Sequence, residues 1–167
     1  MSLRHKQQPM KARLFRVLRW LLIVLACALI IAQFYRPAKT NPASDPSQAI
    51  EARLRVTPPV AAILDRSCND CHSNKTRWPW YSHIAPVSWL LVSDVNEGRQ
   101  NVNFSEWDHY TKSDAQGLLR QICREVRAGV MPLAIYKPLH PSAKLSTDDV
   151  NTLCTWTDAE RARLATP

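Results

Sequence analysis

Two cysteines and a histidine stand close together in the middle of the chain, as Cys68-Asn69-Asp70-Cys71-His72. Two thiols separated by two residues can each add to one vinyl group of a haem, and a histidine directly after them can reach the iron. The spacing therefore predicts one covalently attached haem c, held by Cys68 and Cys71, with His72 as the proximal axial ligand.

Two other uses of a Cys-x-x-Cys pair remain as alternatives. A thioredoxin-like disulfide belongs in a βαβ context, and no such pattern surrounds this pair. A zinc site needs further ligands, whereas Cys123 and Cys154 have no neighbouring Cys or His at zinc-finger spacing. The histidine directly after the pair favours haem over both.

A haem with both axial positions filled needs a second ligand, and Met131 is the only methionine beyond the first ten residues. It directly precedes Pro132, whose ring fixes the backbone, so that the turn can hold the thioether toward iron. A methionine can instead fill a gap in the core. We predict His72 and Met131 as the metal ligands. Three other histidines are alternative ligands: His83, His109 and His140. Among them, His140 is the strongest alternative to Met131.

Aromatic and basic residues around the motif offer further contacts. The chain holds six tryptophans, and the broad apolar face of a haem is a surface that large rings can cover. We predict that Trp78 and Trp80, which follow the motif most closely, contact the cofactor, while other tryptophans serve the core. Three cations could pair with the haem propionates, although solvated charges are the ordinary outcome: Lys75, Arg77 and Arg99.

Helices must position the motif, because apolar residues recur at three- and four-residue spacing through much of the chain. From Ile50 onward this spacing marks short helices that are interrupted by Pro58 and Pro59, and the last of them leads directly into Cys68. The cysteine pair is therefore expected at a helix end. Residues 78–81 contain a proline between aromatic residues and predict a loop.

Two further helices are predicted before residue 130. Pro86 is suited to the first turn of a helix that continues to about Gly98. Ser113 or Asp114 can cap a second helix, which has a clear apolar face and ends at Gly129.

The C-terminal region predicts one more helix. Ser146-Thr147-Asp148-Asp149 resembles a capping box with Asp in place of Glu, and apolar residues repeat at helical spacing after it. The chain has only three glycines, and no alternating strand pattern or internal repeat competes. The fold class predicted from the sequence is all-α.

An apolar segment near the N-terminus predicts a membrane anchor. Residues 20–35 carry no charge and are apolar around the whole helix they would form. The segment is shorter than the ~20 residues of a full span, but Arg16, Arg19 and Arg36 can snorkel. We predict one transmembrane helix. A signal peptide without a good cleavage site and a lipoprotein signal at Cys27 are the weaker alternatives.

The charge distribution orients this anchor and limits the partners. The formal net charge is +8, but residues 1–35 hold six Lys and Arg and no acid, which leaves 16 basic against 14 acidic residues in the rest. We therefore predict no nucleic-acid partner for the folded part. By the positive-inside rule the N-terminus is cytoplasmic, so in a bacterium the chain is a single-pass inner-membrane protein whose folded domain is periplasmic.

Four regions follow from these patterns. The predicted boundaries are a basic cytoplasmic arm over residues 1–19, a transmembrane anchor over residues 20–35, a proline-rich linker over residues 36–48 and a haem-binding domain over residues 49–167.

The segments CNDCHSNKTRWPWYSHIAPVSWLLVSDVNEGRQNVNFSEW and GVMPLAIYKPLHPSAKLSTDDVNTLCTW resemble a bacterial haem-binding domain family related to monohaem cytochromes c. The resemblance covers about residues 60–157, and the motifs WPWYS, APVSW and NFSEW make it specific. It implies a small cytochrome-c-like helical domain, with haem on Cys68 and Cys71, His72 proximal and Met131 distal. It supplies no redox partner.

Cys123 and Cys154 lie on the apolar faces of two predicted helices. They can form a disulfide between those helices or remain as two free cysteines in the core, and both possibilities stay open.

The function predicted from the sequence is one-electron transfer by a membrane-anchored c-type haem protein, a carrier rather than an enzyme. The alternative is a haem-based sensor or peroxidase-like enzyme with an open distal site, where a residue such as His83 or His140 handles the bound molecule. A third class is a haem-free binding module that uses the aromatic loop.

Overall fold

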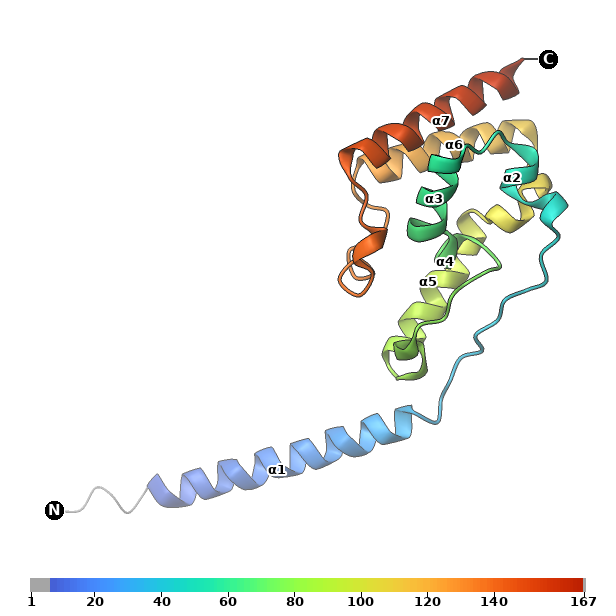
Figure 1. The fold of residues 1–167 in the computed structure, drawn as a ribbon. Helices are drawn as coiled ribbons and strands as arrows, with labels where there is room; N and C mark the ends of the chain where they lie inside the picture. The colour runs from blue at the N-terminus through green and yellow to red at the C-terminus, as the bar shows by residue number, and fades with distance from the viewer. Residues whose placement is uncertain (1–6, 167) are drawn as a thin grey trace. The chain divides into compact units, whose positions relative to one another are not determined.

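A computed structural model describes residues 7–166, which form seven α-helices linked by 3-10 turns and loops, with no β-strand among them (Figure 1). The predicted all-α fold is confirmed. The described residues divide into two compact units: residues 7–38 with 79–92, and residues 39–78 with 93–166. The first six residues of the predicted basic arm and Pro167 lie outside the described residues.

The first unit contains the helix α1 (Gln7–Ala32). Its stretch Met10–Ala32 is long and apolar enough to cross a membrane, and none of it is buried against other described residues. The predicted anchor over residues 20–35 overlaps the C-terminal half of this helix. The unit also holds the 3-10 turn η2 (Trp80–His83), in the predicted loop, and the first residues of α5 (Val87–Asn101).

The second unit is a helical domain with one apolar core. Its helices α6 (Lys112–Arg127) and α7 (Thr147–Ala165) run antiparallel side by side (Figure 1). The shorter elements are η1 (Pro46–Gln48), α2 (Ile50–Arg53), α3 (Pro58–Ser67), α4 (Asn69–His72), η3 (Phe104–His109) and η4 (Pro141–Ala143). The core consists of Ile50, Leu54, Val60, Ile63, Leu64, Val102, Phe104, Trp107, Ala115, Leu119, Cys123, Val126, Leu153, Cys154 and Trp156.

The observed helix ends match the predicted ones where the sequence carries a strong capping signal. Ser146 and Asp149 form the predicted capping box at the start of α7. Gly129, which follows the C-cap residue Ala128 of α6, has φ +70°, a conformation that glycine adopts without steric cost. The predicted cap of α6 at Ser113 or Asp114 was wrong: the cap is Thr111, whose hydroxyl accepts a hydrogen bond of 3.2 Å from the Asp114 N–H.

The predicted end of α5 at Gly98 was also wrong, because the helix continues to Asn101. A glycine near the end of an apolar pattern is often the residue that terminates a helix. Here it lies inside the helix, at a point where another segment of backbone comes close.

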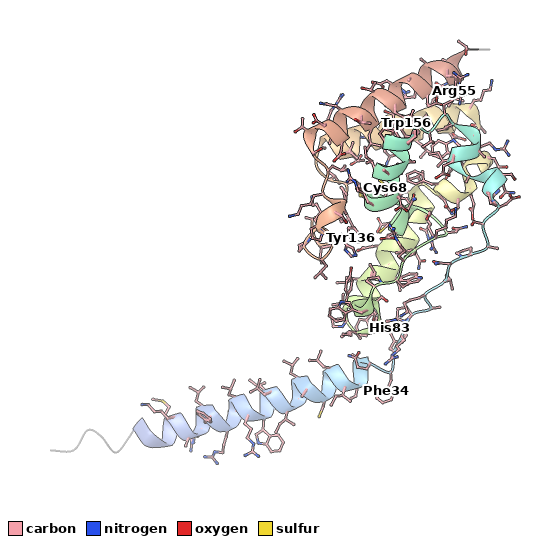
Figure 2. The ribbon with its side chains drawn as sticks, in the orientation of Figure 1. Phe34, Arg55, Cys68, His83, Tyr136 and Trp156 are labelled. Atoms are coloured by element: carbon pink, nitrogen blue, oxygen red, sulfur yellow. A yellow bond between two sulfur atoms is a disulfide. The ribbon has the colours of Figure 1, made fainter. Side chains whose placement is uncertain are left out.

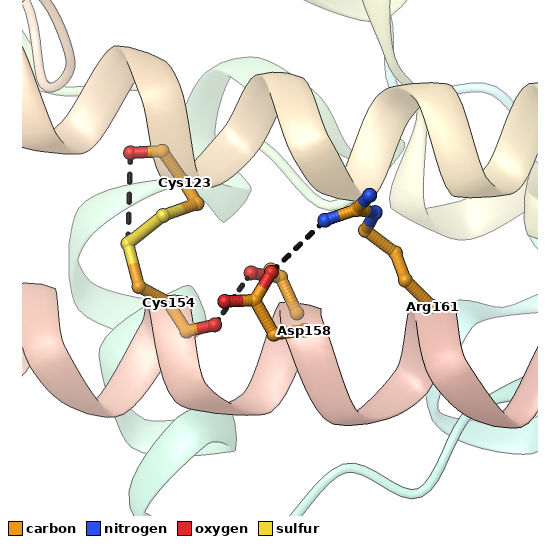
Figure 3. The surroundings of a disulfide bond; sticks show 5 residues. Cys123, Cys154, Asp158 and Arg161 are labelled. Carbon is orange, nitrogen blue, oxygen red and sulfur yellow. Dashed lines mark hydrogen bonds and ion pairs between the residues drawn. A yellow bond between two sulfur atoms is a disulfide. The ribbon is translucent and has the colours of Figure 1, made fainter.

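A disulfide joins Cys123 of α6 to Cys154 of α7, with their Cα atoms 4.8 Å apart (Figure 3). The structure thus selects the bridge over two free core cysteines. On the same helix, the indole N–H of Trp156 donates a hydrogen bond of 3.1 Å to the carbonyl of Arg55 (Figure 2). Both contacts hold α7 against the rest of its unit.

Candidate haem site

The two cysteines of the motif lie where one helix ends and the next begins. Cys68 is both the C-cap of α3 and the N-cap of α4, so the chain changes direction at this residue. The backbone N–H groups of Cys71 and His72 both donate to the Cys68 carbonyl, at 3.1 and 3.0 Å. This single turn holds Cys71 and His72 next to Cys68, as the sequence predicts for a motif at a helix end.

The imidazole of His72 is fixed by backbone carbonyls. Its Nδ1 lies 2.9 Å from the Gly98 oxygen and 3.2 Å from the Val102 oxygen, so Nδ1 carries the proton and donates. Nε2 is the ring nitrogen that remains to bind a metal. Burial lowers the pKa of His72, against the opposing effect of the two carbonyls, which favours the neutral ring that a metal requires.

Gly98 allows α5 to approach the motif closely. A Cβ atom at this position would lie 2.6 Å from the Cys71 oxygen and 3.1 Å from the Cys71 carbonyl carbon. Real Cβ atoms do not come so close to backbone, so only glycine permits the observed packing. The same approach brings the Gly98 carbonyl to His72.

Cys68 and Cys71 are free, partly buried thiols. Burial raises the pKa of Cys68 to about 12, with a further contribution from Cys71. Burial also raises the pKa of Cys71 to about 11, with further contributions from the carboxylates of Asp70 and Asp94. Both groups are therefore protonated thiols at neutral pH, and they are not bridged to each other.

A polar network connects the segment after the motif to η3. The Asn74 N–H donates to the Ser105 hydroxyl at 3.0 Å, and its side-chain amide donates to Glu106 Oε1 at 2.9 Å. Asn103 donates in turn to Asn74 Oδ1 at 2.9 Å and accepts from the Ser105 N–H. Asn74, Asn103 and Ser105 are buried, so these bonds satisfy polar groups that water cannot reach.

The two arginines considered for haem propionates are engaged with protein groups. Arg77 Nε pairs with Asp70 Oδ1 at 3.0 Å, and its guanidinium also reaches Asp65 at 3.1 Å. Arg99 donates to the Ser73 carbonyl at 2.8 Å and to the Thr76 hydroxyl at 2.8 Å. It also bonds to the linker, at the Thr40 carbonyl and the Asn41 side chain.

Met131 lies half-buried in the loop after α6. It packs against the same apolar cluster that Cys68 contacts, and its N–H donates to the Glu125 carbonyl at 3.3 Å. The loop is also tied to the motif through Tyr136, whose hydroxyl donates to Asp70 Oδ2 at 2.8 Å. Figure 2 labels Tyr136 on this loop and Cys68 at the end of α3.

His140, the alternative distal ligand, stacks on the ring of Tyr136. The two rings are stacked with centroids 3.8 Å apart, and His140 Nδ1 lies 3.2 Å from the Tyr136 carbonyl. Of the other histidines, His109 is exposed in η3 beside acidic residues, and His83 is exposed in the first unit.

A family model described as a haem-binding domain matches residues 27–159, most of the chain. The chain belongs to this haem-binding domain family. The match is wider than the resemblance noted in the sequence, because it begins inside α1 and includes the linker. No curated protein and no solved structure matches the chain.

The residues of this haem-binding domain fit the group its family binds. The thiols of Cys68 and Cys71 are available, and His72 presents one unengaged ring nitrogen. In addition, the indole nitrogen of Trp78 is buried and has no hydrogen-bond partner among the described residues. An orphaned buried donor is costly, and a haem propionate is an acceptor of the kind it lacks.

Trp80 differs from Trp78. It lies in the other unit, in η2, where its indole is exposed and makes an edge contact with Tyr81 at 5.7 Å between ring centroids. Its predicted contact with the cofactor stays a prediction.

Several residues that shape the haem-binding domain were not found from the sequence. Gly98 was assigned to a helix end, and the carbonyls that hold His72 carry no side-chain signal. The buried Asn103 begins the motif NFSEW and the buried Asn74 lies two residues after His72, but their pairing is seen only in the tertiary structure.

Proposed function

We propose that this chain is a membrane-anchored c-type haem protein that transfers single electrons, with one haem attached through Cys68 and Cys71. The proposal depends mainly on one observation: two backbone carbonyls, those of Gly98 and Val102, accept hydrogen bonds from Nδ1 of His72. This histidine directly follows the second of the two free thiols. The two carbonyls orient the ring and leave Nε2 as the proximal ligand. Cys68 and Cys71 would hold the haem as thioethers, each S–H adding across one vinyl group to give a C–S and a C–H bond without net oxidation. The haem supplies an iron that carries one electron between its ferrous and ferric states.

Met131 is the proposed distal ligand. Support comes from its position in the loop that Tyr136 ties to Asp70, and from its packing on the apolar cluster that Cys68 also contacts. If His72 and Met131 both held the iron, they would leave no open site on it for a substrate, so we propose a carrier rather than an enzyme. A methionine ligand also favours a higher reduction potential than a second histidine would.

The tryptophans after the motif complete the proposed cofactor contacts. Trp78 would donate its indole N–H to a haem propionate, which would satisfy this buried donor. For Trp80 the support is sequence proximity to the motif alone.

The proposed topology is a single pass through a bacterial inner membrane. We assign the cytoplasmic arm to residues 1–19, the anchor to residues 20–35, the linker to residues 36–48 and a periplasmic haem-binding domain to residues 49–167. The basic residues before the apolar run support this orientation. The disulfide between Cys123 and Cys154 supports an oxidising compartment for the domain.

The deciding experiment is the ligand-state spectrum of full-length protein matured with the c-type haem apparatus. We expect haem that stays bound after denaturation, and a ferric far-red thioether band that Met131→Ala abolishes. His140→Ala is the matched control and should retain the band. A high-spin ferric spectrum with rapid carbon monoxide binding to the ferrous form would instead identify a sensor or peroxidase-like enzyme. Loss of all haem on denaturation would reject covalent attachment.

A further inference from the structure

The segment 79–92 of the first unit is attached to the end of α1. Gln33 and Ala85 form a two-point amide pair, in which Gln33 Nε2 donates to the Ala85 carbonyl at 3.2 Å and the Ala85 N–H donates to Gln33 Oε1 at 3.0 Å. The Trp89 indole donates to the Tyr35 carbonyl at 2.8 Å, and the two rings meet edge to face at 5.8 Å. Figure 2 labels Phe34 at the end of α1 and His83 in the attached segment.

This segment exposes large apolar side chains without any charge among them. Residues 79–92 contain no Asp, Glu, Lys or Arg, and the N-terminal part of the unit, residues 7–38, contains no acid. The exposed fractions are 73% for Trp80, 45% for Ile84, 42% for Val87 and 55% for Leu90. Phe34 and Tyr35, at the end of α1, are exposed by 86% and 72%. Adjacent exposed apolar residues of this kind mark a contact surface.

We propose that residues 84–90 lie in the outer headgroup region of the lipid bilayer, as a second membrane contact beside the anchor. This inference rests on the proposed membrane anchoring of α1. Gln33 is the first polar residue after the apolar run, so it marks the level at which the helix leaves the hydrocarbon. The interfacial layer on each side is roughly 5–7 Å thick, and the Ala85 backbone lies hydrogen-bonded to Gln33.

The composition of the segment favours lipid over a protein partner. Trp and Tyr are the residues enriched at membrane interfaces, where their rings contact acyl chains and their polar atoms stay hydrated. A docking surface for a charged redox partner would carry charges around its apolar centre, and residues 79–92 carry none. With no acid in residues 7–38 and 79–92, the unit also faces no repulsion from anionic headgroups.

The test is photo-crosslinking of full-length holoprotein in vesicles of phosphatidylethanolamine and phosphatidylglycerol that contain a diazirine-bearing lipid. Peptide mass spectrometry then locates the adducts. We expect adducts on α1 and on residues 79–92, with none on α6. Adducts confined to α1 would overturn the inference while leaving the anchor intact. Absence of adducts on α1 would reject the anchor itself. Protein–protein cross-links at residues 79–92 without lipid adducts would assign the surface to a second copy and overturn the inference.

A variant separates lipid contact from mere proximity. Replacing Ile84, Val87 and Leu90 together with Ser removes three of the exposed apolar side chains and should reduce the adducts on residues 79–92 about tenfold, with the adducts on α1 unchanged. The control replaces Ile135 and Leu139, which are similarly exposed in the other unit, with Ser and should leave all adducts unchanged. An equal yield of adducts on residues 79–92 in wild type and in the triple variant would overturn the inference. The haem absorbance and circular dichroism of each variant verify that it is folded.

Discussion

Tyr136 and Asp70 are joined by a hydrogen bond of 2.8 Å, which the tyrosine hydroxyl donates to Oδ2 of the carboxylate. Asp70 lies between the two cysteines of the motif, and Tyr136 lies in the loop that contains Met131. Asp70 Oδ1 is occupied separately by Arg77. The bond therefore connects the loop of the proposed distal ligand to the segment that carries the proposed proximal ligand, His72.

Replacing Tyr136 with Phe keeps the ring that stacks on His140 but removes the hydroxyl. Because a hydrogen bond to a charged group contributes ~1.5–3 kcal/mol, we expect a loss of that order, at its lower end, in the free energy of unfolding. The loop should open more often, so exogenous imidazole should displace Met131 from ferric iron more readily. Urea unfolding and an imidazole titration measure the two effects.

Tyr110→Phe is the matched control for this experiment. The Tyr110 hydroxyl accepts a hydrogen bond of 2.9 Å from the Asn103 N–H, near η3 and not in the Met131 loop. This variant should lose unfolding free energy without a change in imidazole affinity. An equal rise in imidazole affinity in both variants would show that Tyr136 has no specific effect on the ligand loop.

Gly98→Ala should disturb the motif directly. The added methyl group would lie 2.6 Å from the Cys71 oxygen, so α5 must move away from α4 and the hydrogen bonds to His72 must lengthen. Overpacking of this kind costs ~1–3 kcal/mol of unfolding free energy. We also expect less covalent haem per protein, measured by the absorbance of the denatured sample.

Gly117→Ala provides the control on the same kind of residue. Gly117 lies within α6, and a Cβ at this position would meet no atom within 4 Å. Alanine is favoured over glycine inside a helix by up to ~1 kcal/mol, so this variant should be slightly more stable with normal haem content. If Gly98→Ala behaved like Gly117→Ala, the close approach would have no structural consequence.

The all-α fold was predictable because its signals are local. Apolar residues at three- and four-residue spacing define α6 and α7, and the capping box at Ser146 depends on residues only three apart. The start of α6 was misassigned because Thr111, Ser113 and Asp114 are all good caps within one turn. Sequence preference alone does not separate such neighbours.

The supports of the site were not predictable, because they join residues that are distant in sequence. His72 is held by carbonyls 26 and 30 residues away, and backbone carbonyls have no residue type that marks them. Likewise, Gln33 and Ala85 are 52 residues apart, so the attachment of segment 79–92 to α1 emerges only from the tertiary structure. The motif itself was found because its chemistry requires adjacent residues.

Removing the disulfide should lower stability substantially. Cys123 and Cys154 are 31 residues apart, and closing a loop of that length stabilises the folded state by ~3–4 kcal/mol through the entropy of the unfolded chain. We expect Cys123→Ser with Cys154→Ser to lose about this free energy of unfolding in urea. Cys27→Ser, which removes an exposed free thiol from α1, is the control and should have no effect. Equal unfolding midpoints of wild type and the double variant would contradict the prediction.

Asp149 should make the free energy of unfolding depend on pH in the acid range. Burial acts to raise its pKa, but the Ser146 N–H and the Arg66 guanidinium, 2.8 and 2.7 Å from the carboxylate, outweigh burial and hold the pKa below the ordinary value of an Asp. A carboxylate with a lowered pKa in the folded state contributes stability above its unfolded pKa and loses it as the pH falls through the folded value. Asp149→Asn should therefore lower the free energy of unfolding by ~1 kcal/mol at neutral pH and by progressively less below about pH 4.

Urea unfolding across this pH range measures the difference, and Asp148→Asn, at the exposed neighbouring position, is the control. A difference between wild type and Asp149→Asn that stays constant with pH would show that the cap does not act through the ionised carboxylate.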